Sequence, residues 1–177
     1  MWEHYATHKR LLEALFGNFD AVKNYRILDA GSGRTSLYFL TTAFPNATIT
    51  GIVYPGDERK IKGIREFVSA KNYTLREIDL KDFKSEAKFN IVLAHLLLGE
   101  ATKFGNRFDD VLNALFSINT DYWVIVDVLE DQEVDYRSIL RIVASKGSIK
   151  ALKSVDEYIG FLISSVLFDR TEKYQLT

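Results

Sequence analysis

Residues 25–37 carry the clearest structural pattern in the sequence, Tyr25-Arg-Ile-Leu-Asp-Ala-Gly-Ser-Gly-Arg-Thr-Ser-Leu37. The apolar pair Ile27-Leu28 predicts a strand that ends near Asp29, and Gly31 and Gly33 predict a tight turn before a helix. A strand, a glycine turn and a helix start form a cradle in which backbone N–H groups face a nucleotide-like ligand. Because two glycines in a turn are common, this pattern alone is a weak indication of a ligand site, and it depends on support from the rest of the chain.

Composition limits the classes of protein that this chain can belong to. The chain has 177 residues, a net charge of -1 and no cysteine. Its length fits a single domain over residues 1–177, with an N-terminal helix at 1–20 and a core at 25–168. The charge balance does not indicate nucleic-acid binding, and the lack of cysteine excludes disulfides, thiolate metal sites and a cysteine nucleophile. Without a run of ~18 apolar residues or an apolar signal core, we expect a cytoplasmic protein that spans no membrane.

Strand and helix patterns alternate along most of the chain. Short apolar or β-branched runs predict strands at 25–30, 47–54, 73–79, 90–94 and 122–128. Apolar residues at helical spacing predict helices at 2–19, 35–44, 58–71, 108–116 and 134–143, and residues 96–107 are expected to form a loop. Only two residues separate the runs at 148–155 and 158–168, and so short a link requires an antiparallel hairpin.

This alternation predicts an α/β fold with three layers. We expect a doubly wound, mostly parallel sheet of seven strands, in which the C-terminal hairpin supplies one antiparallel strand. In such sheets a ligand lies outside the carboxyl ends of the strands. The sequence therefore predicts a ligand site among residues 29–35, 53–57, 79–83 and 95–100.

The pattern resembles that of the class I S-adenosylmethionine-dependent methyltransferases over residues 25–168. Ile27-Leu-Asp-Ala-Gly-Ser-Gly33 is similar to the first motif of that family, and Glu77-Ile-Asp79-Leu80 is similar to the loop that contacts adenine. Phe89-Asn-Ile-Val-Leu-Ala94 resembles the fourth strand, with Asn90 where the family often has Asp. The resemblance implies S-adenosylmethionine as methyl donor and S-adenosylhomocysteine as product. The donor contacts that it implies are Asp29, Gly31, Ser32, Gly33, Thr35, Val53, Tyr54, Asp57, Asp79, Leu80 and His95.

Asp29 favours this family over the nicotinamide dehydrogenases. An acid at this position would repel a pyrophosphate, whereas it suits a ligand that carries a sulfonium and an ammonium group. Capping the turn is the alternative role for Asp29, and both roles can coexist. Arg34 follows the glycines and either meets the carboxylate of the donor or is solvated.

The sequence departs from the family at two positions. Thr35 replaces the third turn glycine, and Val53 stands where the family usually has an acid that binds both ribose hydroxyls. A hydrogen bond to a charged group contributes about 1.5–3 kcal/mol, so we expect the missing acid at position 53 to weaken binding of the donor. Without that acid, the ribose is held either by Asp57 or Glu58, which lie a few residues further on, or by backbone groups and water. A non-catalytic module of the same fold that binds the donor or a nucleotide is therefore the alternative function.

Several site residues have an ordinary structural role as an alternative. Asp79 either accepts from the adenine amino group or is a strand-end acid, and Leu80 covers either the purine or the core. Tyr54 either stacks on the ligand or belongs to the edge of the core. His95 follows a strand directly, so a neutral imidazole there is a candidate proton acceptor, and Glu100 is a weaker one. The alternative for His95 is a hydrogen bond to the backbone of the 96–99 turn.

The predicted first helix carries residues whose role in the site the sequence indicates only weakly. His4 and His8 have metal-ligand spacing, but without a third ligand we expect no metal. Trp2 and Tyr5 either close over the site or pack on the sheet.

The identity of the methyl acceptor is not indicated by a motif. The chain has no Asn-Pro-Pro-Tyr run and no cysteine pair of the kinds that base-methylating enzymes use. The acceptor is thus an unidentified small molecule or exposed RNA or protein group. Net charge does not support a nucleic acid, no membrane partner is expected, and the oligomeric state is open.

Overall fold

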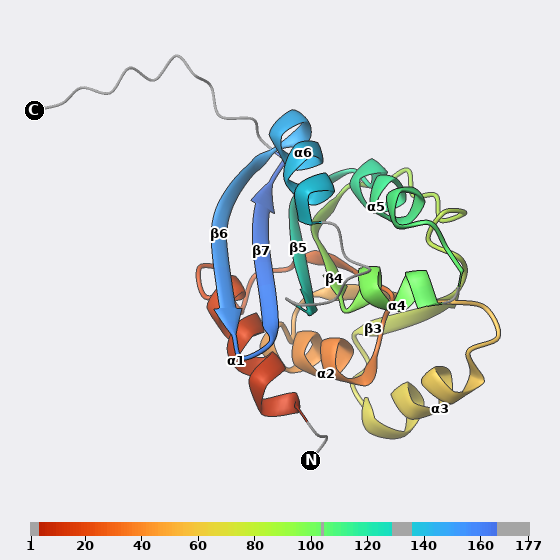
Figure 1. The fold of residues 1–177 in the computed structure, drawn as a ribbon. Helices are drawn as coiled ribbons and strands as arrows, with labels where there is room; N and C mark the ends of the chain where they lie inside the picture. The colour runs from red at the N-terminus through yellow and green to blue at the C-terminus, as the bar shows by residue number, and fades with distance from the viewer. Residues whose placement is uncertain (1–3, 104, 129–135, 166–177) are drawn as a thin grey trace, which may run out of the picture.

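The computed structural model describes residues 4–103, 105–128 and 136–165, which form one sheet with helices on both faces (Figure 1). The strands run in the order β3-β2-β1-β4-β5-β7-β6. Their bounds are β1 Arg26–Ala30, β2 Thr48–Val53, β3 Tyr73–Glu77, β4 Phe89–His95, β5 Thr120–Val128, β6 Ser148–Val155 and β7 Tyr158–Ser164. The helices are α1 Tyr5–Phe16, α2 Arg34–Ala43, α3 Glu58–Phe67, α4 Leu97–Lys103, α5 Phe108–Ser117 and α6 Tyr136–Lys146.

The pairing of the strands confirms the fold class that the sequence predicts. β1 to β5 are parallel, and β7 is antiparallel to both β5 and β6. The sequence order reverses beside β1, which pairs with β2 on one side and with β4 on the other. The carboxyl ends of these strands therefore flank the switch point at which doubly wound sheets bind their ligands.

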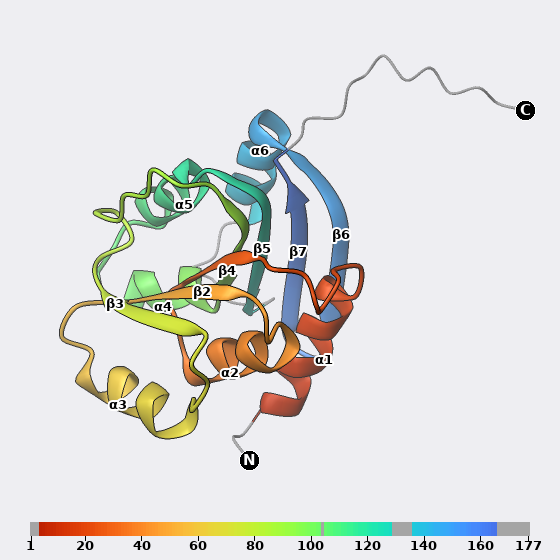
Figure 2. The same cartoon turned by 180° about the vertical axis from the view of Figure 1, so that it is seen from behind.

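Alternate residues of the central strands supply two separate cores. On one face, Ile27, Ile91 and Val124 pack with apolar side chains of α1, α2 and α3. On the other face, Leu28, Val92 and Ile125 pack with α5 and α6. A strand that is buried on both faces is apolar throughout, which explains the unbroken apolar runs of β4 and β5. Figures 1 and 2 show α1, α2 and α3 on one side of the sheet and α5 and α6 on the other.

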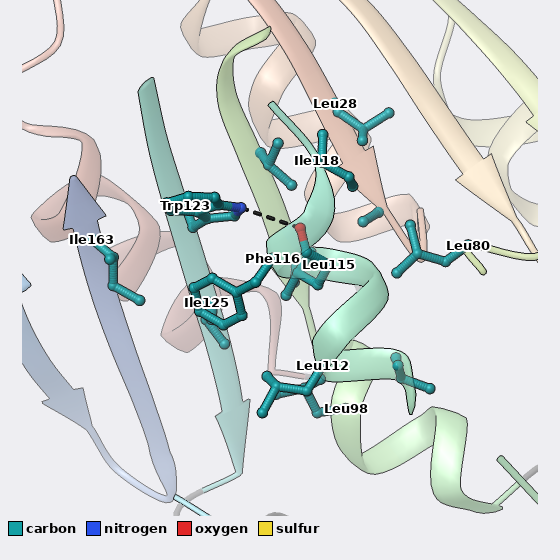
Figure 3. Packing of buried hydrophobic residues seen from close by; sticks show 14 of the residues in the cluster. Leu28, Leu80, Leu98, Leu112, Leu115, Phe116, Ile118, Trp123, Ile125 and Ile163 are labelled. Carbon is teal, nitrogen blue, oxygen red and sulfur yellow. Dashed lines mark hydrogen bonds between the residues drawn. The ribbon is translucent and has the colours of Figure 1, made fainter. Parts of the chain in front are cut away.

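Trp123 joins α5 to the centre of the sheet. Its indole Nε1 donates a hydrogen bond of 3.2 Å to the carbonyl of Leu115, in the last turn of α5 (Figure 3). Phe116 packs on the same indole, with ring centroids 5.1 Å apart. The Leu115 carbonyl also accepts from the backbone N–H of Ile118 at 3.3 Å, so the indole is a second donor to it at the end of the helix. The indole thereby joins β5 to the end of α5.

One element differs in kind from the sequence expectation. The sequence predicts a loop at 96–107, but α4 covers Leu97–Lys103, so that prediction is wrong. Leu96 takes a left-handed conformation with φ 56°, which turns the chain sharply out of β4. The short helix has only one buried turn, around Leu98, and so shows no apolar period in the sequence. Other boundaries move by a few residues, and α3 ends at Phe67 rather than 71.

The described helices include none that combines the length and the apolar character needed to cross a membrane. Trp2, residues 129–135 with the expected start of the helix at 134, and the expected end of the last strand at 166–168 lie outside the described residues. The expectation of a single domain over the whole sequence stays a prediction.

Candidate functional site

The turn between β1 and α2 is built closely around its glycines. Gly31 has φ 75°, a conformation that side chains disfavour, and a Cβ there would lie 2.6 Å from Leu97 Cδ1. The next residue, Ser32, is fully buried, and its backbone N–H donates to the carbonyl of Ile52 across 2.6 Å. Gly33 is extended and immediately precedes α2. The turn is therefore fixed between β2 and α4, with the start of α2 beside it.

Asp29 lies fully buried beneath this turn. Its Oδ2 accepts a hydrogen bond of 2.7 Å from Ser36 Oγ, which in turn accepts from the backbone N–H of Gly33. Its Oδ1 has no hydrogen-bond partner among the described residues. Burial raises the pKa of Asp29 to about 7, although Ser36, Ser32 and Lys60 each lower it in part. A cation bound at the turn would therefore favour the ionised form of this carboxyl group.

A cleft opens beside the turn, at the carboxyl ends of β1, β2 and β3 and at the start of α4. It encloses about 560 Å³, open solvent included. Apolar side chains form much of its wall, as is usual for small-molecule sites. The lining residues are Gly31, Ile52, Tyr54, Asp57, Lys60, Ile78, Asp79, Leu80, Leu97, Glu100, Ala101, Asn106 and Val111.

One wall of the cleft is the loop after β3. Leu80 is 8% exposed, packs in the core and also lines the cleft, while its contact with a purine stays a prediction. Asp79 Oδ1 accepts from the backbone N–H of Lys81 at 2.9 Å, which holds the carboxylate at the end of the loop. Ala101 and Val111 belong to the same cleft. This wall is therefore mainly apolar, with the Asp79 carboxylate among its residues.

The loop after β2 supplies another wall. Tyr54 is 49% exposed and lines the cleft. Asp57 lines it too, while its Oδ1 caps α3 by accepting from the backbone N–H of Lys60 at 3.0 Å. Val53 is buried within the parallel ladder, and its carbonyl accepts from Ile78 N–H. Glu58 is exposed and is not among the described residues that line the cleft.

Two further residues that sequence reasoning placed at the turn lie beside the cleft rather than in its wall. Thr35 is half-buried in the first turn of α2 and is not one of the described lining residues. The Arg34 guanidinium lies over the ring of Phe67, 4.9 Å from its centroid. Such a cation–π contact holds the cation against α3.

His95 ends β4 but turns away from the cleft, toward α1. It is 7% exposed, and its ring lies edge-on to His8 with centroids 4.8 Å apart. Burial lowers the pKa of His95 to about 3, with smaller effects of His8 and Lys60, so its imidazole is neutral at pH 7. His95 is not among the described lining residues, and its Nε2 has no hydrogen-bond partner in the described part of the chain.

Asp127 of β5 holds the turn after β4, a role that the sequence analysis offered to His95. Its buried Oδ2 accepts from the N–H groups of Leu98 at 3.0 Å and of Gly99 at 3.4 Å. Sequence reasoning missed this residue, although a carboxylate inside an apolar strand was the available signal. It also missed Lys60 and Asn106, because polar residues on a helix or loop usually face solvent.

The first helix packs on the sheet. Tyr5 is buried, with its ring edge-on to Tyr38 at 5.6 Å. His8 is 6% exposed and lies 4.3 Å from the ring of Tyr158, while His4 is exposed near Glu157. Within residues 4–103, 105–128 and 136–165, no three His, Cys, Asp or Glu side chains are grouped so that they could hold a metal ion.

Comparison with known proteins gives matches in structure and none in sequence. No family model and no curated protein matches this chain. The 16S rRNA methylase RmtB superposes with a TM-score of 0.68 at 17% identity, over 92% of this chain and 64% of its own. An S-adenosylmethionine-dependent methyltransferase from Aquifex aeolicus gives 0.65 at 14% identity, over 94% of this chain and 100% of its own.

A third structure, magnesium protoporphyrin IX methyltransferase from Synechocystis, was solved with bound S-adenosylmethionine. It gives a TM-score of 0.67 at 15% identity, over 93% of this chain and 79% of its own. The present chain spans just under two thirds of the length of RmtB. These likenesses concern the arrangement of the elements. This chain therefore has the fold of the class I S-adenosylmethionine-dependent methyltransferases.

Proposed function

We propose that this protein is an S-adenosylmethionine-dependent methyltransferase that acts on a small molecule or on an exposed group of RNA or protein. The main support is the buried Asp29 carboxyl group beneath the glycine turn, because its Oδ1 has no partner in the described residues and Gly31 of the same turn lines the cleft. A ligand with positive charge at its amino-acid end complements this arrangement. The shared fold adds support, since its solved examples include methyltransferases that act on rRNA and on a porphyrin.

The residues of the cleft suit the parts of the donor. Gly31 lines the cleft and Gly33 immediately precedes α2, so this turn suits the amino-acid end, with Asp29 below it. The wall at Leu80 suits the purine, and Asp79 at the end of the loop suits its amino group. When bound, the donor supplies a sulfonium methyl group that is already reactive, so the protein contributes mainly position and orientation.

A proton acceptor is needed only where the acceptor group begins protonated. His95 holds a neutral imidazole, as that role requires, yet His8 covers it on the side of α1. This cover, together with Val53 in place of an acid, favours the second candidate, a module of the same fold that binds the donor without transferring its methyl group. The role of His95 and a cytoplasmic location stay predictions.

Calorimetric titration with S-adenosylmethionine and S-adenosylhomocysteine tests binding. We expect both ligands to bind with dissociation constants below about 1 mM, the usual upper range for enzyme substrates. If neither ligand binds at millimolar concentration, both candidate functions are wrong with respect to this cofactor.

Methyl transfer separates the two candidates. The donor with a labelled methyl group is incubated with pools of small molecules, RNA and protein. We expect transfer that Gly33→Asp abolishes and that the matched control Gly17→Asp, at the exposed end of α1, leaves in place. Donor binding with no transfer to any pool would favour the non-catalytic module.

A further inference from the structure

The cleft contains an ion pair that the proposed function has not used. Lys60 Nζ of α3 lies 2.7 Å from Glu100 Oε2 of α4, and both residues line the cleft. The two helices follow β2 and β4, so the pair joins its opposite sides. An exposed ion pair adds little stability, which makes a purely structural purpose a weak explanation for this one.

The pair lies close to the glycine turn. A Cβ on Gly33 would lie 3.8 Å from Lys60 Cε, so the stem of this lysine passes over the turn. On the other side, Leu97 contacts Gly31, and Glu100 lies one helical turn beyond Leu97. The pair therefore lies beside the turn, in the same cleft as the apolar wall at Ile78 and Leu80. With the amino-acid end of the donor at the turn and the purine at the wall, the ribose lies between them, beside this pair.

The chain offers few other charged groups for this position. Val53, at the place of the expected acid, is buried in the sheet. Asp57 uses Oδ1 to cap α3, and Asp79 is held by Lys81 at the far wall. Among the described residues that line the cleft, the remaining charged ones are Lys60 and Glu100.

We propose that the Lys60–Glu100 ion pair binds the two ribose hydroxyls of the methyl donor, in place of the acid that Val53 replaces. This assignment rests on the proposed function. A vicinal diol offers hydroxyl donors and oxygen acceptors side by side. The Glu100 carboxylate accepts from a hydroxyl, and the Lys60 ammonium donates to a hydroxyl oxygen. Because the diol is neutral, the two charges continue to compensate each other when it is bound.

The test measures the contribution of the hydroxyls rather than overall affinity. S-adenosylhomocysteine and its analogue without both ribose hydroxyls are titrated calorimetrically into wild type, Glu100→Gln and Lys60→Met. We expect wild type to prefer the complete ligand by about 10- to 100-fold, as hydrogen bonds to charged groups imply. In both variants most of that preference should disappear, while affinity for the analogue stays nearly the same.

Lys62 and Glu66 provide the matched control. They form an exposed ion pair of 3.7 Å on α3 and are not among the described lining residues of the cleft. Lys62→Met and Glu66→Gln should leave the preference of wild type intact. The side chains of Lys60 and Glu100 are 25% and 48% exposed, so the variants should fold, which thermal unfolding checks.

The outcomes separate this assignment from the function on which it rests. If wild type binds neither S-adenosylmethionine nor S-adenosylhomocysteine, the proposed function fails and the assignment fails with it. If wild type binds the complete ligand but Glu100→Gln keeps the full preference, or loses affinity for both ligands equally, the assignment alone is wrong. A preference that disappears in Asp57→Asn and persists in Glu100→Gln would also overturn it.

Discussion

Leu97 of α4 lies against Gly31 of the β1–α2 turn so closely that a Cβ at Gly31 would stand 2.6 Å from Leu97 Cδ1. The helix that the sequence does not predict thus rests directly on the turn that it predicts most clearly. Gly31 also has φ 75°, so two physical reasons require glycine at this position. The shape of the turn and the position of α4 depend on each other.

Gly31→Ala should destabilise the protein by about 2–5 kcal/mol, the sum of left-handed backbone strain and overpacking. Gly56→Ala is the matched control, because Gly56 has φ 82° and a Cβ added there would meet no atom within 4 Å, so it should lose only about 1–2 kcal/mol. Urea unfolding measures both losses. Adding Leu97→Ala to Gly31→Ala should recover part of the difference. Equal losses in Gly31→Ala and Gly56→Ala would show that the contact with Leu97 is unimportant.

Asp127 should be the anchor of α4. Asp127→Ala leaves the N–H groups of Leu98 and Gly99 without their acceptor and should cost about 2–4 kcal/mol. Asp127→Asn keeps an acceptor oxygen and should cost less. Hydrogen exchange of the two amides measures the effect locally, and both should exchange faster in Asp127→Ala. Unchanged protection of these amides, with the stability lowered, would place the contribution of Asp127 elsewhere.

The strands and the glycine turn could be predicted from the sequence because burial on both faces leaves a local signal. An apolar run such as Ile91–Ala94 is visible without any tertiary information. Val124 and Ile125 belong to the cores on opposite faces of the sheet, and both are apolar because both faces are covered. The fold class depends mainly on such runs and on the length of their links, so sequence reasoning reached it.

The parts that could not be predicted depend on contacts between distant segments. The seven-residue α4 contains Gly99 and one buried turn, and Asp127 from β5 fixes its start. Lys60 looks like a solvated helix residue until its Glu100 partner is brought to it by the fold. The place of His95 at a strand end predicts a position beside the ligand. Its contact with His8 depends on how α1 docks, which the sequence does not reveal.

The buried His95 should make the protein sensitive to acid. Its pKa in the folded protein, about 3, lies below the ordinary histidine value of 6.5, so the unfolded chain binds a proton first as the pH falls. The stability that neutral His95 provides is therefore complete above pH 6.5 and is lost as the pH falls toward 3. The difference in unfolding free energy between wild type and His95→Leu should fall by about 1.4 kcal/mol per pH unit in this range.

Urea unfolding from about pH 7.5 to about pH 4.5 measures that difference, since this interval spans the upper part of the titration. Asp29 titrates in both proteins and changes their stability with pH in the opposite direction, so its contribution cancels in the difference between them. Val22→Ala, at a position 68% exposed, is the control, and its difference from wild type should stay constant with pH. A difference that is constant with pH would show that His95 gains a proton in the folded protein as easily as in the unfolded chain.

Asp29 should release a proton when the donor binds. The pKa of its carboxyl group is raised to about 7, so at pH 7 about half of the molecules hold the proton. A bound sulfonium and ammonium favour the carboxylate, and binding should therefore release about half a proton at about pH 7 and much less at about pH 8.5. Calorimetry in phosphate and in Tris, which differ in ionisation enthalpy, measures this number. Asp29→Asn should bind more weakly and release none, and equal release from Asp29→Asn would assign the proton to another group.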